Sequence, residues 1–364
     1  MTESHPRRAM PAPKAKGGRR LLVIILALVL IAGGGGVAYY LGFLDRFLPG
    51  SITGPDQGDP TPTDLPDQWP LTGVIGEVSS RPALAAKITN DPDLRPSDGL
   101  HEADIVFEYL NGSGTTEFLA IYHSNLPIQL APIHTLSSID GALAGWTSGL
   151  IAFSTGLPDF VQQTRSSGLQ LLANNQGNDG FTEVTGWSSP QIAGDPKVLV
   201  SRADPNHQGL PPAFCAVDNR NDGSTAQNKG TMANNVMVIF GPDATPMWQW
   251  EAAFGKWLRF EGEAPALRYG GGQLSAVNVI TIEVEVRDTG LTGPDGQPYK
   301  AAIVTGQGRG LVASGQMVAE ITWIKESATA PWQFLDSTGE PLVLVPGSTW
   351  IELVPRGAGE WVVY

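Results

Sequence analysis

The chain has 364 residues, of which 41% are hydrophobic and 16% are charged, a composition typical of a folded globular protein. Its 44 glycine and 29 proline residues predict many turns and a strand-rich molecule rather than long helices. The single cysteine, Cys215, excludes an internal disulfide bond.

Charge is distributed unevenly along the chain. Residues 1–20 form a basic segment with six Lys or Arg residues and one Glu, a net charge of +5. Because the whole chain has a net charge of −13, the other residues together carry −18. A field of this sign repels phosphate backbones, so we do not expect nucleic acid as a partner.

Residues 21–43 are uncharged and largely apolar, with the sequence LLVIILALVLIAGGGGVAYYLGF. A helix of this length crosses a hydrocarbon core about 30 Å thick, which predicts a single transmembrane helix in contact with the lipid bilayer. The basic segment before it predicts a cytoplasmic N-terminus and an extracytoplasmic remainder. A cleaved signal peptide is the alternative, but the apolar run exceeds the usual length of its hydrophobic region.

Beyond the apolar run, residues 44–68 are rich in Pro, Gly and Asp and are interpreted as a linker. Residues 69–220 are predicted to form an α/β-type domain. Short apolar runs bounded by turn residues predict its strands at 82–88, 103–110, 117–123 and 150–154. Helices are expected at 139–146, capped by Ser137 or Ser138, and at 159–172.

Residues 230–364 are predicted to form a second, mostly antiparallel β domain. Strands are expected at 236–240, 277–286, 301–306, 317–326, 349–354 and 360–364. The fold class is therefore α+β, with an α/β-type domain followed by a β-rich one. Five aromatic residues between Trp248 and Phe260 form a carbohydrate-stacking platform if exposed, but their alternation favours burial in the core.

Six polar residues are candidates for ligand binding. Arg95 and Arg202 are conspicuous among few cations, and a guanidinium recognises carboxylate or phosphate through its planar fork. Their companions are Asn90, Glu108, Asn111 and His207. No catalytic residue, cofactor or metal site is predicted, because no H-x-x-x-H, H-E-x-x-H or D-x-D-x-D-G pattern occurs.

Several segments together resemble the YerB-like family of bacterial membrane lipoproteins and anchored proteins, a two-part family of unknown function. They are WPLTG at Trp69, SRPALAAKITNDPDLRPSDGLHEADIVFEYLNGSGTTEFLAIYHS from Ser80, and ITWIKESATAPWQFLDSTGEPLVLVPGSTWIELVP from Ile321. The resemblance extends from Trp69 to Pro355. It implies an extracytoplasmic two-part protein with no established reaction.

This chain also departs from the pattern that the resemblance implies. The pattern reads K-I-D-N where the chain has Thr89, T-R-F where it has Glu117, and G-P-V-R-S-A-R where it has His134 and Ser137. An arginine-lined site can therefore not be assumed. Lipoproteins of the family are held by a lipidated cysteine, whereas this chain is expected to use residues 21–43.

The leading interpretation is a membrane-anchored, extracytoplasmic, non-enzymatic protein that binds a cell-envelope ligand or an envelope protein partner. The alternative is a hydrolase or transferase that acts on a wall polymer, with Asn90, Arg95, Glu108, Asn111 and His207 lining its cleft. A nucleophile or acid with an organised partner in one pocket would favour the alternative.

Overall fold

The computed structural model describes residues 67–112, 114–174, 180–292, 296 and 298–364. The predicted basic segment 1–20, the predicted membrane span 21–43 and nearly all of the predicted linker 44–68 lie outside these residues. Within the described part of the chain, no helix is both long enough and apolar enough to span a bilayer. Residues Leu65–Tyr364 form one compact unit.

The unit is built on a 12-stranded mixed sheet. Its strand order is β19-β18-β17-β15-β21-β2-β3-β1-β4-β5, with β16 added beside β15 and β9 beside β18. In chain order these strands are β1 (Leu84–Thr89), β2 (Ile105–Leu110), β3 (Thr116–Tyr122), β4 (Leu150–Phe153), β5 (Gln170–Ala173), β9 (Thr231–Met232), β15 (Asn278–Thr292), β16 (Pro298–Ile303), β17 (Gly306–Ser314), β18 (Met317–Lys325), β19 (Gln333–Asp336) and β21 (Thr349–Pro355).

A second, six-stranded antiparallel sheet packs on one face of the first. Its strands are β10 (Asn235–Ile239), β11 (Pro246–Glu251), β12 (Lys256–Glu261), β13 (Ala264–Pro265), β14 (Ser275–Ala276) and β22 (Glu360–Val363). Two small pairs are formed by β6 (Phe181–Val184) with β7 (Gln191–Gly194) and by β8 (Ala216–Val217) with β20 (Val343–Leu344).

The helices are few and short. They are α2 (Asp140–Ala144), α3 (Pro158–Arg165), α4 (Pro196–Ser201) and α5 (Thr225–Lys229), with one-turn 3-10 helices at Pro92–Leu94, Leu100–Glu102 and Gly145–Thr147. The expectation of a strand-rich α+β molecule is thereby confirmed at the level of mixed sheets with few helices.

Both faces of the large sheet are buried, and alternate residues of its strands contribute to two separate hydrophobic clusters. In β2, Phe107 belongs to one cluster and Val106 to the other. Side chains alternate across a strand with a period of two, so near-continuous apolar runs are what a strand covered on both faces requires. The charged residues within these runs are consequently carried into the interior.

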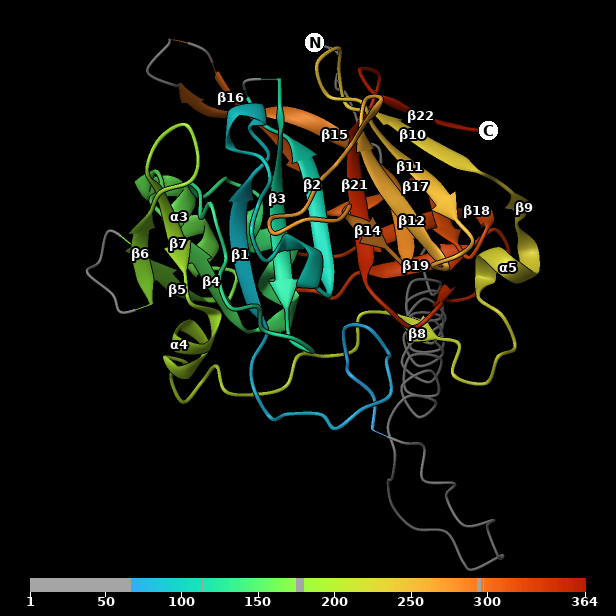
Figure 1. The fold of residues 1–364 in the computed structure, drawn as a ribbon, viewed down its shortest axis with the longest axis horizontal. Coiled ribbons are helices and arrows are strands. Elements are labelled where there is room, and N and C mark those ends of the chain that lie inside the picture. Colours follow the sequence, from blue (N-terminus) through green and yellow to red (C-terminus); the bar gives the residue numbers. More distant parts are fainter. Residues whose placement is uncertain (1–66, 113, 175–179, 293–295, 297) are drawn as a thin grey trace, which may run out of the picture. The chain divides into compact units, whose positions relative to one another are not determined.

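The strand β21 connects the two sequence segments. It pairs in parallel with β2 from segment 69–220 and with β15 from segment 230–364 (Figure 1). All seven residues of β21 are buried. Buried backbone N–H and C=O groups need hydrogen-bond partners, so the strand requires a paired strand at each edge. The apolar pattern at 349–354 predicts a strand of a separate antiparallel sheet, and that expectation was wrong for this strand. Segments 69–220 and 230–364 both contribute strands to the 12-stranded sheet. Their division into two domains therefore stays a prediction from the sequence.

Two local expectations also need correction. The helix expected at 159–172 ends at Arg165, because Gly168 turns the chain with φ +82° and the following residues pair with β4 as β5. Neither Ser137 nor Ser138 caps α2 through its side chain, and it is instead Asp140 that accepts a hydrogen bond from the Ser137 amide, at 2.7 Å.

The aromatic group of β11 and β12 is largely core. Trp248 and Trp257 are fully buried, and Trp248 packs edge-on against Trp350 of β21 with ring centroids 5.1 Å apart. Phe254 alone among the five is well exposed, at the turn between the strands. These rings therefore hold the second sheet on the first and do not form a stacking platform.

Candidate functional site

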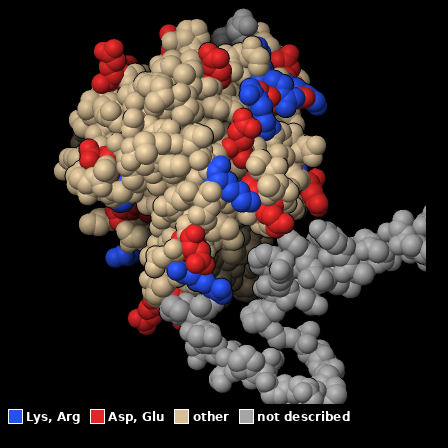
Figure 2. All heavy atoms as spheres, turned by 90° about the vertical axis from the view of Figure 1, so that its right-hand side faces the viewer, with Lys and Arg blue, Asp and Glu red and all other residues tan. Residues whose placement is uncertain are grey.

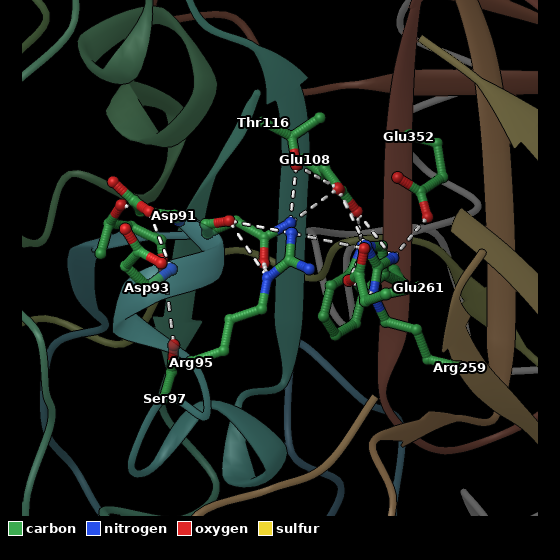
Figure 3. A network of polar contacts seen from close by, with 12 residues as sticks. Asp91, Asp93, Arg95, Ser97, Glu108, Thr116, Arg259, Glu261 and Glu352 are labelled. Atoms are coloured by element: carbon green, nitrogen blue, oxygen red, sulfur yellow. Dashed lines mark hydrogen bonds and ion pairs between the residues drawn. The ribbon is translucent and has the colours of Figure 1, made fainter. Parts of the chain in front are cut away.

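A buried guanidinium lies between the two sheets. Arg259 of β12 is fully buried, and its Nη1 and Nη2 atoms lie 2.7 and 2.9 Å from the two carboxylate oxygens of Glu108. Glu108 is on β2, so this bidentate pair joins the second sheet to the first (Figure 3). Charge-assisted bidentate pairs combine strength with fixed geometry.

Two further carboxyl groups contact Arg259. Glu261 Oε1 accepts hydrogen bonds from its Nη2 at 2.8 Å and its Nε at 3.0 Å, and Glu352 Oε1 lies 3.3 Å from Nη1. Burial and the neighbouring Glu108 raise the pKa of the Glu352 carboxyl well above its usual range. The protonated form of Glu352 is thereby favoured, and its carboxyl group accepts a hydrogen bond from Trp248 at 2.7 Å.

The loop after β1 brings Arg95 to this network. Asn90, buried at the end of β1, donates to Thr116 at 2.7 Å and accepts from Arg95 Nε at 2.9 Å. Asp91 caps the following one-turn helix, Pro92–Leu94, by accepting a hydrogen bond from the Asp93 amide. This turn brings the Arg95 side chain back to Asn90. Arg95 Nη2 then lies 3.5 Å from Glu261 Oε2.

A cavity of about 270 Å³ adjoins Arg95. Its lining residues are Asn90, Arg95, Pro96, Ser97, Leu100, Phe118, Glu261, Ala264, Pro265, Ala266, Leu267 and Leu274. The Arg95 and Glu261 side chains are 31% and 19% exposed, so both remain accessible there. Nearby, Trp187 stacks on Tyr269 and donates to Pro96 O at 3.2 Å. The Arg95 cavity, as we call it, combines apolar walls with one cation and one anion.

A second ionic cluster lies on the opposite face of the same strands. Residues 108 and 109 alternate across β2, so Tyr109 points away from Arg259 and contacts the buried ammonium of Lys87 on β1. Lys87 also contacts Glu117 of β3, donates to Ser137 at 3.0 Å, and lies 3.6 Å from Asp140 Oδ1. We call these residues the Lys87 cluster.

The Lys87 cluster shifts the titration of its acids. Burial acts to raise the pKa of Glu117, but the charge of Lys87 and a contribution from His134 outweigh it, so the pKa is lowered. Burial raises the pKa of Asp140, against the opposing charge of Lys87. Burial, reinforced by the two acids, raises the pKa of the Tyr109 hydroxyl.

The structure brings three of the six predicted site residues together. Asn90, Arg95 and Glu108 meet in the Arg259 network, and Asn111 lines a different cavity beside the Lys87 cluster. Arg202 and His207 line neither cavity. The His207 ring lies 2.8 Å from Asp204 and 3.1 Å from the Gly168 carbonyl, contacts that order its own loop. A ligand role for all six stays a prediction.

Sequence analysis did not single out the residues at the centres of the two clusters, namely Arg259, Glu261, Glu352, Lys87, Tyr109 and Asp140. The available signal was a charged residue at an inward position of an apolar strand, as in KWLRFE or TWIELVP. Among the residues that the structure describes, no group of three or more His, Cys, Asp or Glu side chains is arranged to hold a metal ion.

Comparison with known protein families identifies both parts of the chain. Residues 71–206 match the model "Protein of unknown function (DUF3048) N-terminal domain", and residues 221–351 match "Protein of unknown function (DUF3048) C-terminal domain". The chain belongs to the YerB-like DUF3048 family. The resemblance noted in the sequence is confirmed.

The YerB protein of Bacillus subtilis is similar to this chain in sequence and in structure. The chain is 25% identical over 306 residues to "Putative lipoprotein YerB" of Bacillus subtilis (strain 168), covering 79% of this chain and 86% of the relative. The crystal structure of the YerB protein from Bacillus subtilis superposes with a TM-score of 0.68 and 21% identity, covering 81% of this chain and 99% of that one. At this identity the superposition shows a shared fold.

Three of the residues at which the sequence departs from the pattern implied by the resemblance lie close together. They are Glu117, His134 and Ser137, and all three lie around Lys87. Ser137 donates to Glu117 at 2.8 Å, and His134 Nδ1 lies 3.7 Å from the other carboxylate oxygen of Glu117. In this chain, Lys87 is therefore paired with the carboxylate of Glu117.

Proposed function

We propose that this chain is a membrane-tethered extracytoplasmic protein whose folded part binds a small uncharged polar ligand of the cell envelope in the Arg95 cavity. The predicted membrane span at 21–43 supports the tether. The description of the Bacillus subtilis relative as a lipoprotein supports a location at the membrane. No reaction is required by this proposal.

The observation that carries the proposal is the pair formed by Arg95 and Glu261. They lie 3.5 Å apart, and both face the cavity. The hydrogen bonds of Arg95 to Asn90 and its contact with Glu261 use Nε and Nη2, so the N–H groups of Nη1 can donate to a ligand. Glu261 Oε2 can accept a further hydrogen bond besides its contact with Arg95. A ligand group that both accepts and donates, such as an amide or two adjacent hydroxyls, complements this pair.

The charges of the site favour an uncharged ligand. The guanidinium groups of Arg95 and Arg259 contact the carboxylates of Glu108 and Glu261, and the raised pKa of Glu352 favours its uncharged form. On the visible face in Figure 2, acidic and basic side chains are interspersed among uncharged residues, so this face presents no extended field of one sign. Leu100, Phe118 and Leu274 add apolar walls to the cavity.

The alternative of a wall-acting hydrolase finds less support at this site. Ser97 is the serine in the cavity lining, and its hydroxyl lies 3.5 Å from the Thr89 carbonyl, a group that cannot accept a proton in catalysis. The carboxylates of Glu108 and Glu261 are held by Arg259, which weakens both as general bases.

Calorimetric titration of the full-length protein in detergent tests the proposal. The probes are N-acetyl-alanine amide and N-acetylglucosamine, with acetate as the charged comparison. Binding of an uncharged probe should weaken about tenfold or more in Arg95→Leu, because a hydrogen bond to a charged group contributes about 1.5 to 3 kcal/mol. Arg202→Gln, outside the cavity, is the matched control. Silence of both uncharged probes, or equal binding by Arg95→Leu, would refute the proposal.

A further inference from the structure

A second cavity, of about 150 Å³, lies beside the Lys87 cluster and shares no lining residue with the Arg95 cavity. Its lining has apolar and aromatic residues, among them Leu157, Phe160 and Tyr299. Its polar residues are Tyr109, Asn111, Glu117, Thr135, Ser137, Ser138 and Lys300. Its volume corresponds to roughly five water molecules at about 30 Å³ each. A group the size of a short alkyl chain with a polar head therefore fits.

The carboxylate of Glu117 has one oxygen committed and one available. Oε2 accepts hydrogen bonds from Lys87 and, at 2.8 Å, from Ser137. Oε1 lies 3.7 Å from His134 Nδ1, which is longer than a hydrogen bond. That ring nitrogen is itself buried without a hydrogen-bond partner among the described residues. The available oxygen belongs to a residue that is only 7% exposed and lines the cavity, so a ligand donor is its natural complement.

Glu117 is the acid of the cluster that faces the cavity. Lys87 is fully buried and contacts the carboxylates of Glu117 and Asp140. Asp140 is outside the cavity lining and accepts hydrogen bonds from Tyr109 and the Ser137 amide. A ligand ammonium that enters the cavity would therefore meet the carboxylate of Glu117, against the repulsion of Lys300, an exposed cation of the lining.

Aromatic rings add a second, independent attraction for a cation. Phe160 of α3 and Tyr299 of β16 both line the cavity, with ring centroids 5.7 Å apart and planes at 80°. The face of an aromatic ring is electron-rich and attracts ammonium groups. Lys87 already uses this attraction, since its Nζ lies 4.5 Å from the centroid of the Tyr109 ring.

We propose that this cavity is a binding site for a primary alkylammonium group, with the ammonium on Glu117 Oε1 and the alkyl chain packed against Phe160 and Tyr299. The site is independent of the Arg95 cavity. One ligand chemistry has two possible sources, a free small amine or the side chain of a lysine-like residue in a peptide.

Calorimetric titration of the full-length protein in detergent with n-butylammonium chloride is the direct test, and n-butanol is the neutral probe of similar shape. We expect n-butanol to bind at least about tenfold more weakly, because it lacks the charge that Glu117 and the rings recognise. Nα-acetyl-lysine amide forms a third arm. Tighter binding than n-butylammonium assigns the site to a peptide side chain, and weaker binding assigns it to a free amine.

Variants at the mouth of the cavity keep the test sharp, because Glu117→Gln also removes the partner of Lys87 and can unfold the protein. Leu157 is 36% exposed, so Leu157→Lys should fold and should abolish n-butylammonium binding by repulsion and occlusion. Lys300 is an exposed cation in the lining, so Lys300→Gln should strengthen binding. Lys256→Gln, at an exposed position of β12 outside both cavities, should leave n-butylammonium binding unchanged. Equal binding of n-butanol, or no effect of Leu157→Lys, would overturn the proposal.

Discussion

Glu108 and Glu352 are direct neighbours in the parallel pairing of β2 with β21, and both contact the guanidinium of Arg259. Two carboxyl groups side by side in the interior cannot both be ionised without a large penalty. The bidentate contact holds the Glu108 carboxylate on Arg259, whereas burial and the neighbouring Glu108 raise the pKa of Glu352 and favour its protonated form. This difference between two equivalent strand positions yields the first prediction.

Glu352→Gln should change the free energy of unfolding by less than about 1 kcal/mol, because Gln reproduces the shape of a protonated Glu. Glu108→Gln should destabilise the fold by about 3 to 5 kcal/mol, because it leaves Arg259 without its bidentate partner. Urea unfolding of the two variants, monitored by tryptophan fluorescence, provides the comparison. A larger loss in Glu352→Gln would show that the charge is assigned to the wrong residue.

Arg259→Leu tests the junction of the two sheets. The change removes one cation and leaves the carboxylates of Glu108 and Glu261 without their buried partner. We therefore expect a loss of about 3 to 5 kcal/mol in unfolding free energy. The control is Arg287→Leu, whose side chain is 65% exposed and whose ion pair with Glu285 should contribute under about 1 kcal/mol. Similar losses in both variants would contradict the role assigned to Arg259.

The strands at the centre of this junction could be predicted from the sequence, but their partners could not. Runs such as ADIVFEYL and EFLAIYH have the apolar character of strands buried on both faces. β2 lies within the first run, and β3 covers the second up to Tyr122 and begins one residue before it. Glu108 was singled out as a polar residue within such a run. Its partner Arg259 lies 151 residues away, on a strand of the other sheet, and local pattern carries no information about that pairing.

The position of β21 was unpredictable for a related reason. TWIELVP shows that the strand is buried, but a strand with two buried faces suits any interior position in either sheet. The end of α3 has a local cause that pattern analysis overlooked. The apolar residues Leu169, Leu171 and Leu172 continue a helical stripe in sequence, yet Gly168 at φ +82° separates them from the helix.

The backbone at Gly99 positions one wall of the Arg95 cavity. Gly99 has φ +78°, and a Cβ atom there would lie 2.4 Å from the Gln129 carbonyl oxygen, directly before the lining residue Leu100. Gly99→Ala should therefore lower the unfolding free energy by about 1 to 3 kcal/mol and weaken ligand binding in that cavity. Gly209→Ala, where the added atom meets nothing within 4 Å, should be nearly neutral. Equal melting temperatures for the two variants would refute this.

His123 should make the fold sensitive to acid. Burial, with a further contribution from Arg81, lowers the pKa of the His123 imidazole to about 4. Its unfolded value is about 6.5, so the unfolded chain takes up the proton first, and stability present above pH 6.5 is lost as the pH falls toward 4. NMR titration of the ring should give a midpoint near the lower value.

The His123 contribution can be isolated by substitution. The neighbouring Asp104 acts in the opposite direction. Burial raises the pKa of its carboxyl group to about 6, so the folded state favours protonated Asp104. This contribution makes the protein more stable as the pH falls through about 6. Comparing wild type with His123→Gln at pH 7 and pH 4.5 removes the Asp104 contribution from the difference. The variant should lose less stability on acidification, and an identical loss would exclude His123 as the acid-sensitive group.

Lys325 should give the fold an alkaline dependence. It is fully buried, it donates to the Ala330 carbonyl, and its Nζ lies 5.2 Å from the Trp332 ring centroid. Burial lowers its pKa to about 8, below the unfolded value of about 10.4, so the unfolded chain holds more protons between these values. Unfolding free energy should therefore rise as the pH increases from 8 to about 10.4. Lys325→Met, which keeps the shape without the charge, should abolish this rise, whereas Lys300→Met at an exposed position should retain it.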